Sequence, residues 1–161
     1  MPNCGNYLSG MYTSTAAWEN GVSSLDFTYS SYSTSNNVIY NIVFLVGNYG
    51  SGGSYGGAIY YNSSGNLVST YNSNTGTYNG PTQNYAYVFI RCNHSLMQSF
   101  TANNRLVAMY SHEIGHALGL AHADYNPYVV MYKYNVDDYY TYYIYLPQTD
   151  DCLGVTNLYS N

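Results

Sequence analysis

The sequence predicts a mixed α+β fold in a single domain over residues 1–161. Short β-branched and aromatic runs fill the first part of the chain, and a long stretch of helical periodicity follows them. No internal repeat and no linker-like change of composition divides the chain. Its 161 residues suit one domain whose hydrophobic core does not depend on disulfides.

The N-terminal half is expected to begin with a helix over residues 9–20, which Ser9 can cap and Gly21 can end. Residues 25–32 alternate like a strand. Residues 38–46 form the longest apolar run, VIYNIVFLV, and predict a buried central strand.

A glycine-rich loop over residues 47–57 leads into further short strands. These strands are predicted at residues 58–62, 67–71 and 85–91. The longest helical signal covers about residues 102–118, where apolar residues recur with nearly helical period and Gly119 ends the pattern. Residues 148–159 predict a final helix capped by Thr149.

The charge balance excludes two large classes of partner. The chain has three Lys and Arg against eight Asp and Glu, with a formal net charge of −5. Nucleic acids and anionic membranes attract clustered Lys and Arg, so neither is an expected partner. The longest apolar run is also far shorter than the roughly 20 residues of a membrane-spanning helix, so no membrane span is expected.

Neutral polar residues dominate the composition. Charged residues make up only 7% of the chain, whereas tyrosine alone occurs 24 times. A typical domain is about one quarter charged, so this surface must be built mainly from neutral hydrogen-bonding groups. Such a surface is unusual for a cytosolic protein and is like that of extracellular proteins. We therefore expect a secreted protein, and a monomer.

The three cysteines, Cys4, Cys92 and Cys152, include no C-x-x-C pair, which argues against a cysteine zinc site. An odd count allows at most one internal disulfide. We favour Cys92 with Cys152, although Cys4 could replace either partner.

The motif with the most chemical content is HEIGHALGLAH, which runs from His112 to His122. His112 and His116 are four residues apart, so on a helix both imidazoles lie on one face and can bind one ion. Gly119 allows the backbone to leave the helix with positive φ, and His122 can then return to the same metal. Three neutral histidines leave the fourth tetrahedral position of a zinc ion open for water.

Glu113 follows the first histidine of the motif and is expected to face the water rather than the metal, as a general base. The chain contains four His, and this spacing would arise by chance with odds of only about a few in a million. The fourth, His94, has no partner at ligand spacing and is interpreted as a surface or structural residue.

The stretch resembles the long zinc motif of the metzincins, HExxHxxGxxH. Metzincins also carry a tight turn with a Met beneath the zinc, and Met131 in the run VVMY follows His122 at a suitable distance. The resemblance implies a metzincin, zincin-like fold. Its parts would be a twisted, mostly parallel sheet with an antiparallel edge strand, an active-site helix and a C-terminal helix.

Within the metzincins the chain is most similar to the matrixins, especially their prokaryotic relatives. HEIGHALGLAH followed by VMY is typical of them. AAWENGVSSLDF resembles the end of their first helix, VIYNIVFLV their central strand, GGAIYY their edge strand and PQTDD..G...LY their closing helix. The resemblance implies a zinc-dependent endopeptidase with one catalytic Zn²⁺ that acts on extended peptides or proteins.

The resemblance also implies a substrate cleft and a mechanism. An extended substrate would pair with the edge strand around Ala58, Ile59 and Tyr60. Tyr132 would line the pocket for the side chain that follows the cut bond. A zinc-activated water would attack the peptide bond, and Glu113 would take its proton as the general base.

The chain departs from the matrixin pattern at three places. Only 17 residues precede Trp18, so the first strand is expected to be short, rearranged or missing. The loop at residues 47–57 has no His, Asp or Glu, so neither a structural zinc nor calcium is expected there. Lys133 stands two residues after Met131, where astacin-like metzincins place a Tyr ligand, and Tyr134 is therefore not expected to bind metal.

Two alternatives stay open. Pro2-Asn3-Cys4-Gly5 resembles the matrixin cysteine switch, in which a thiolate occupies the zinc site, whereas a disulfide or a free cysteine is the favoured reading of Cys4. The alternative function is a catalytically inactive or non-enzymatic zinc-binding surface or adhesion protein.

Overall fold

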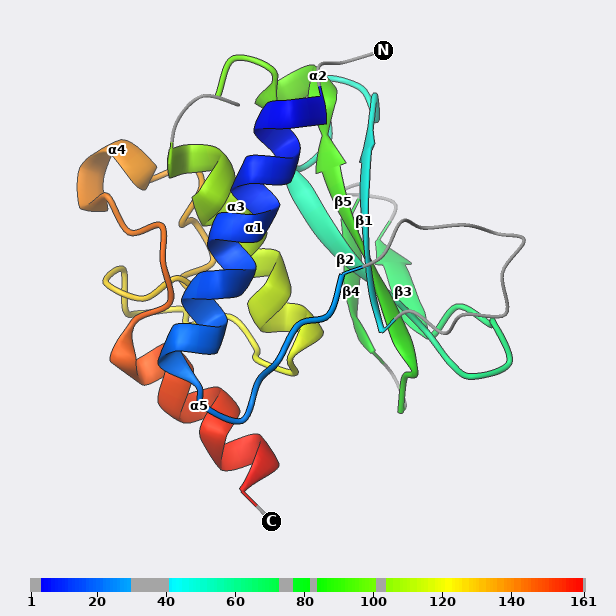
Figure 1. The fold of residues 1–161 in the computed structure, drawn as a ribbon. Coiled ribbons are helices and arrows are strands. Elements are labelled where there is room, and N and C mark those ends of the chain that lie inside the picture. The colour runs from blue at the N-terminus through cyan, green and yellow to red at the C-terminus, as the bar shows by residue number, and fades with distance from the viewer. Residues whose placement is uncertain (1–3, 30–40, 73–76, 82–83, 101–103, 161) are drawn as a thin grey trace.

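The computed structural model describes residues 4–29, 41–72, 77–81, 84–100 and 104–160 (Figure 1). Helices and a mixed sheet share one domain, which confirms the α+β class. The helices are α1 (Cys4–Gly21), α2 (His94–Met97), α3 (Asn104–Ala117), α4 (Tyr139–Tyr142) and α5 (Thr149–Tyr159). The strands are β1 (Ile42–Gly47), β2 (Gly56–Tyr61), β3 (Ser69–Asn72), β4 (Thr77–Pro81) and β5 (Tyr87–Asn93).

The main sheet has three strands in the order β1-β5-β2, and a two-stranded β3-β4 sheet lies beside β2. β5 is parallel to β1 and antiparallel to β2, so the predicted antiparallel edge strand is confirmed. The strand expected at residues 38–46 is present as β1 (Ile42–Gly47), and residues 38–40 lie outside the described part of the chain. In the described sheet β5, rather than β1, is the middle strand. Burial explains the difference: β5 buries Val88 and Ile90 completely, whereas β1 leaves Val46 37% exposed.

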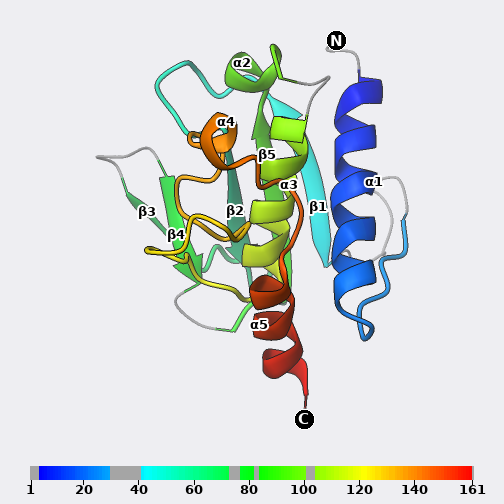
Figure 2. The same cartoon turned by 90° about the vertical axis from the view of Figure 1, so that its left-hand side faces the viewer.

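Helices α1 and α3 lie side by side against the sheet (Figures 1 and 2). Gly10 of α1 makes the approach possible, because a Cβ there would come within 3.1 Å of the Leu106 side chain. The fully buried Trp18 donates its indole N–H to the carbonyl of Ser111 at 3.0 Å. The largest fully buried side chains are Trp18, Tyr110, Ile59, Ile90, Met97, Leu106, Met109, Ile114, Val88, Val130 and Val155.

The structure corrects the element boundaries near the N-terminus. Helix α1 begins at Cys4, five residues before the predicted start at Ser9. Residues 25–29 form no strand, and the rest of the strand predicted at 25–32 lies outside the described residues. The backbone N–H of Phe27 bonds the Glu19 carboxylate at 2.6 Å. This side-chain bond uses the N–H that a strand partner would need.

The predicted disulfide between Cys92 and Cys152 is wrong, because both are free cysteines. Cys92 is fully buried in β5, where its thiol hydrogen-bonds Tyr110 and burial raises its pKa to about 12. Cys152 of α5 packs against Gly21. The Cys4 side chain lies outside the described part, so its predicted roles stay predictions.

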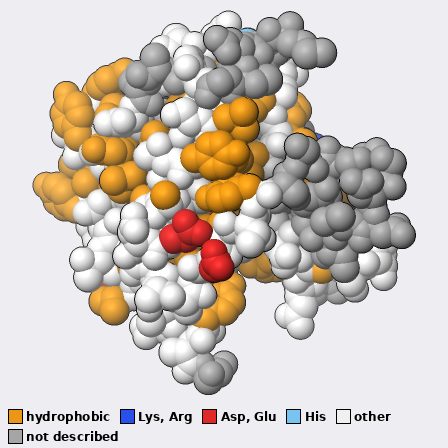
Figure 3. All heavy atoms as spheres, viewed as in Figure 1, with side chains coloured by type: hydrophobic (Ala, Val, Ile, Leu, Met, Phe, Trp, Pro, Cys, Tyr) orange, Lys and Arg blue, Asp and Glu red, His pale blue; other side chains and the backbone are white. Residues whose placement is uncertain are grey.

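The surface of the molecule carries few charged side chains, as the composition predicts. Figure 3 shows a face covered by hydrophobic and neutral polar side chains, with the acidic ones gathered in one small group. None of the helices in the described ranges is long and apolar enough to cross a membrane.

Asp151 in the first turn of α5 ties this helix to the segment that contains Val130 and Met131. One carboxylate oxygen accepts the N–H groups of Val130 and Gln148, both at 2.8 Å, and the other accepts the Met131 N–H at 3.2 Å. Gln148, rather than the predicted Thr149, is therefore the N-cap of α5. Burial raises the pKa of Asp151, and the three backbone bonds offset part of that rise.

Replacing Asp151 with Asn should lower the free energy of unfolding by about 1–3 kcal/mol, because an amide keeps only one acceptor oxygen for these N–H donors. Asp150→Asn is the matched control, since Asp150 is exposed on the same helical turn. Urea denaturation of both variants measures the difference. Equal stability of the two would mean that the carboxylate does not anchor the segment.

Candidate metal centre

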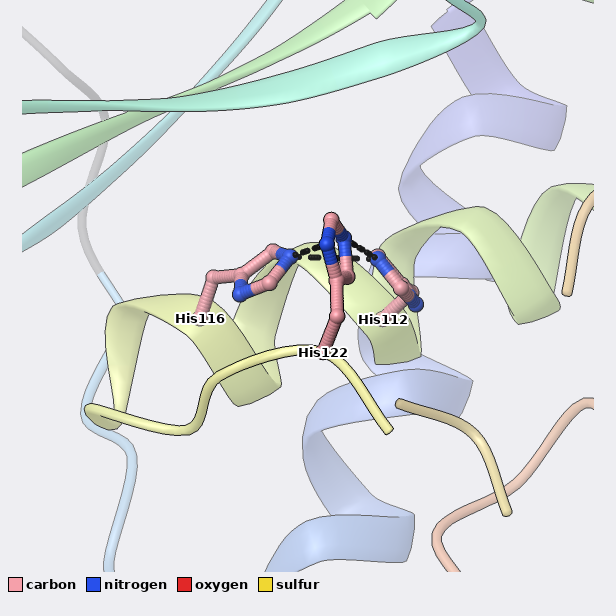
Figure 4. Close-up of side chains that lie close together, drawn as sticks. All are labelled: His112, His116 and His122. Atoms are coloured by element: carbon pink, nitrogen blue, oxygen red, sulfur yellow. Dashed lines mark hydrogen bonds between the residues drawn. The ribbon is translucent and has the colours of Figure 1, made fainter. Parts of the chain in front are cut away.

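Three histidines converge on one point (Figure 4). His112 and His116 project from α3, and His122 lies on the loop that follows this helix. Their Nε2 atoms are 3.1, 3.1 and 3.2 Å apart. Three nitrogens bound to one zinc ion at about 2.0–2.1 Å in tetrahedral geometry would be separated by about 3.3 Å, so the trio fits such an ion closely.

In His112 and His116, the hydrogen bond made by Nδ1 determines whether Nε2 carries a proton. Nδ1 of His112 lies 2.8 Å from the carbonyl of Val130, and Nδ1 of His116 lies 2.8 Å from the carbonyl of Leu120. A carbonyl can only accept, so both Nδ1 atoms donate their proton and both Nε2 atoms present a lone pair. A shared cation is the partner that satisfies converging lone pairs.

Burial keeps these imidazoles neutral, which metal binding requires. It lowers the pKa of His112 well below its usual value and the pKa of His116 to about 4. Burial also lowers the pKa of His122. The nearby Asp124 raises this pKa, and Lys133 lowers it. Asp124 and Lys133 form a salt bridge at 3.3 Å, so their opposite effects act from one ion pair beside this histidine.

The turn between the second and third histidines follows the sequence prediction. Gly119 has φ +98°, in the left-handed region that glycine adopts at little cost. The chain reverses there and brings His122 back to the exposed side of the trio, while His112 remains buried. Solvent therefore reaches the three Nε2 atoms from the His122 side.

Glu113 is buried beside the histidines and faces the same cleft. Burial raises the pKa of its carboxyl to about 8, and a hydrogen bond from the backbone of Ala58 acts in the opposite direction. A cation held by the neighbouring histidines would lower this pKa towards neutrality. The group can therefore both accept and release a proton.

A cleft of about 940 Å³ runs along β2 and past the three histidines. The predicted cleft residues Ala58, Ile59 and Tyr60 all line it. The ring of Tyr132 packs edge-to-face on Tyr134 and Tyr142, and its role in a pocket for the substrate side chain stays a prediction. The residues after Tyr132 that line the cleft are Lys133, Asn135, Val136 and Asp137.

The outer edge of β2 offers backbone groups to the cleft. The Tyr60 N–H bonds the Ser69 hydroxyl at 2.8 Å and its carbonyl accepts the Val68 N–H at 2.9 Å, so these groups point away from β5. Strand backbone orientation repeats every two residues, and Ala58 therefore also directs its backbone groups away from β5.

Met131 packs against α3 at Gly115, where there is no room for a larger side chain. A Cβ at Gly115 would collide with the Met131 sulfur and come within 3.1 Å of the Trp18 ring. The preceding carbonyl, that of Val130, accepts from both His112 and the Asn135 amide, the latter at 3.0 Å. The role of Met131 as a Met-turn residue stays a prediction.

The sequence analysis missed the groups that support the ligands from outside the motif. The Val130 carbonyl orients His112, and Asp151 holds the backbone that carries it. A backbone carbonyl leaves no signature in a sequence. The sequence analysis placed Asp151 in a helix that Thr149 would cap, and only the structure connects this residue to the site.

A sequence profile described as matrixin matches residues 11–160. The chain belongs to the matrixin family. This confirms the resemblance and makes the chain a metallopeptidase, whose family implies zinc and peptide or protein substrates. No curated protein and no solved structure matches this matrixin.

His116→Ala should weaken zinc binding by more than about 100-fold, because even changes outside the ligand shell cost 10- to 100-fold. His94→Ala is the control: its Nδ1 lies 2.7 Å from the Tyr7 hydroxyl, outside the trio. Competition with a coloured zinc chelator measures both affinities. Wild-type affinity in the His116 variant would exclude this histidine as a ligand.

Proposed function

We propose that this matrixin is a secreted zinc-dependent endopeptidase in which Glu113 is the general base. The observation that carries the proposal is the convergence of three Nε2 atoms beside a buried carboxyl on one cleft. One zinc ion per chain, held by His112, His116 and His122, is part of this proposal.

The bound zinc ion supplies Lewis acidity, which polarises a carbonyl and lowers the pKa of a water molecule. Glu113 accepts the proton of the attacking water and later donates it to the nitrogen of the leaving amine. The hydrogen bond from the Ala58 backbone holds the carboxyl in place during both transfers. The Nδ1–H bonds of His112 and His116 keep both imidazoles oriented and neutral.

The substrate would lie extended along β2. Backbone pairing with the outward-facing carbonyl of Ala58 would provide affinity for any peptide, because it does not depend on side chains, whereas the Ala58 N–H holds Glu113. Met131 is proposed as the Met-turn residue, which supports the ligands from below through its contact with Gly115.

Secretion and a monomeric state are also part of the proposal. Secretion is supported by composition: a chain that is only 7% charged presents a neutral surface unlike that of cytosolic proteins. Localisation of the tagged protein in its native cell and light scattering of the purified protein test the two statements.

Glu113→Gln should reduce the rate of peptide hydrolysis by about 10²- to 10⁴-fold, because an amide cannot take the proton of water. Zinc content should stay at the wild-type value. Glu19→Gln, which keeps an acceptor for the Phe27 N–H, is the matched control. A non-enzymatic zinc protein would give equal, background rates for the wild type and both variants.

A fluorogenic peptide blocked at both termini should be cleaved at an internal bond by the wild type. An endopeptidase binds the backbone on both sides of the cut and needs no free terminus. Mass spectrometry of the products locates the bond. Cleavage only of the unblocked peptide would contradict the endopeptidase assignment.

A further inference from the structure

The end of α3 carries the second histidine and the turn that leads to the third. The Gly119 N–H donates to the His116 carbonyl at 2.9 Å, and the Leu120 N–H donates to the Gly115 carbonyl at 3.0 Å. With Gly119 at positive φ, these two bonds form a Schellman motif. The carbonyls of Ala117 and Leu118 still require donors from elsewhere, because no further turn follows them, and the His116 carbonyl has room for a second donor.

Three tyrosine hydroxyls supply donors to three consecutive carbonyls. Tyr60 donates to the carbonyl of His116 at 3.0 Å. Tyr85 donates to Ala117 at 2.9 Å, and Tyr159 donates to Leu118 at 3.2 Å. The donors come from β2, from the segment before β5 and from the end of α5, so three separate parts of the chain meet at this one turn.

The surrounding packing holds these rings in position. The Tyr60 and Tyr85 rings meet edge-to-face with centroids 4.9 Å apart. Beside Tyr159, Leu158 packs on Gly119, where a Cβ would lie 3.3 Å from its side chain.

The turn also controls the metal site directly. The Leu120 carbonyl accepts the Nδ1–H of His116 at 2.8 Å, and two residues later the chain reaches His122. A shift of this backbone would therefore move the orientation of one histidine and the position of another.

We infer that the hydroxyls of Tyr60, Tyr85 and Tyr159 position the metal centre by fixing the turn at the end of α3. They act through the backbone and are positioning residues, not catalytic residues. The inference rests on the proposed zinc site and adds the groups that hold its second and third histidines in register.

Tyr→Phe variants remove only the hydroxyl and keep the ring. Tyr85→Phe, Tyr159→Phe, their double variant and the triple variant with Tyr60→Phe form the series. Tyr12→Phe is the matched control, since Tyr12 lies on the outer side of α1 and packs on Tyr29. Two readouts are used: the rate of zinc transfer to a chelator and the visible spectrum of the Co²⁺-substituted protein.

Each single variant should lose zinc about five-fold faster, and the double variant about 20-fold faster, as expected from hydrogen bonds of ordinary strength. The Co²⁺ bands should change in position or intensity, because they report ligand geometry. Tyr12→Phe should match the wild type in both readouts. If the triple variant does not fold, the single variants test the inference.

A purely structural role gives a different result. The melting temperature would then fall, while zinc release and the Co²⁺ spectrum stayed at wild-type values, and this outcome overturns the inference. Failure of the proposed function is separate: the wild type itself would then bind neither zinc nor Co²⁺, whereas failure of the inference alone leaves wild-type binding intact.

Discussion

The constraint on which the rest of the structure depends is the convergence of three imidazole nitrogens. The Nε2 atoms of His112 and His116 lie 3.1 Å apart and both present lone pairs, which repel one another unless a cation or a proton donor lies between them. These two rings must therefore be held by a partner at their Nδ1 side. The carbonyls of Val130 and Leu120 serve His112 and His116, and each carbonyl lies on a segment fixed by other contacts.

Those contacts explain the arrangement of the remaining elements. Val130 is held by Asp151, so α5 must pack beneath the segment that contains Met131. Gly115 lets Met131 and Trp18 both reach α3 at the level of the ligands. The sheet supplies the opposite wall, where Ala58 of β2 hydrogen-bonds Glu113. Helix α1 contributes the fully buried Trp18 to the core.

The sequence predicted the parts of the site that depend on local spacing. His112 and His116 share a helical face, and Gly119 adopts the positive φ that its position required. The short elements α2, α4 and β4 were missed, because four or five residues carry too little periodicity. The strand expected at residues 25–29 and the disulfide failed for another reason. Each depended on tertiary partners, such as Glu19 for Phe27, that spacing does not encode.

The position of α5 in the chain has a consequence for biosynthesis. Its residues Asp151 and Tyr159 hold, respectively, the Val130 segment and the end of α3. A ribosome delivers the three histidines before it delivers either of these supports. The nascent chain therefore carries the complete ligand motif before the groups that hold it in place. The metal centre can reach its final geometry only after α5 has been synthesised and has packed against both segments.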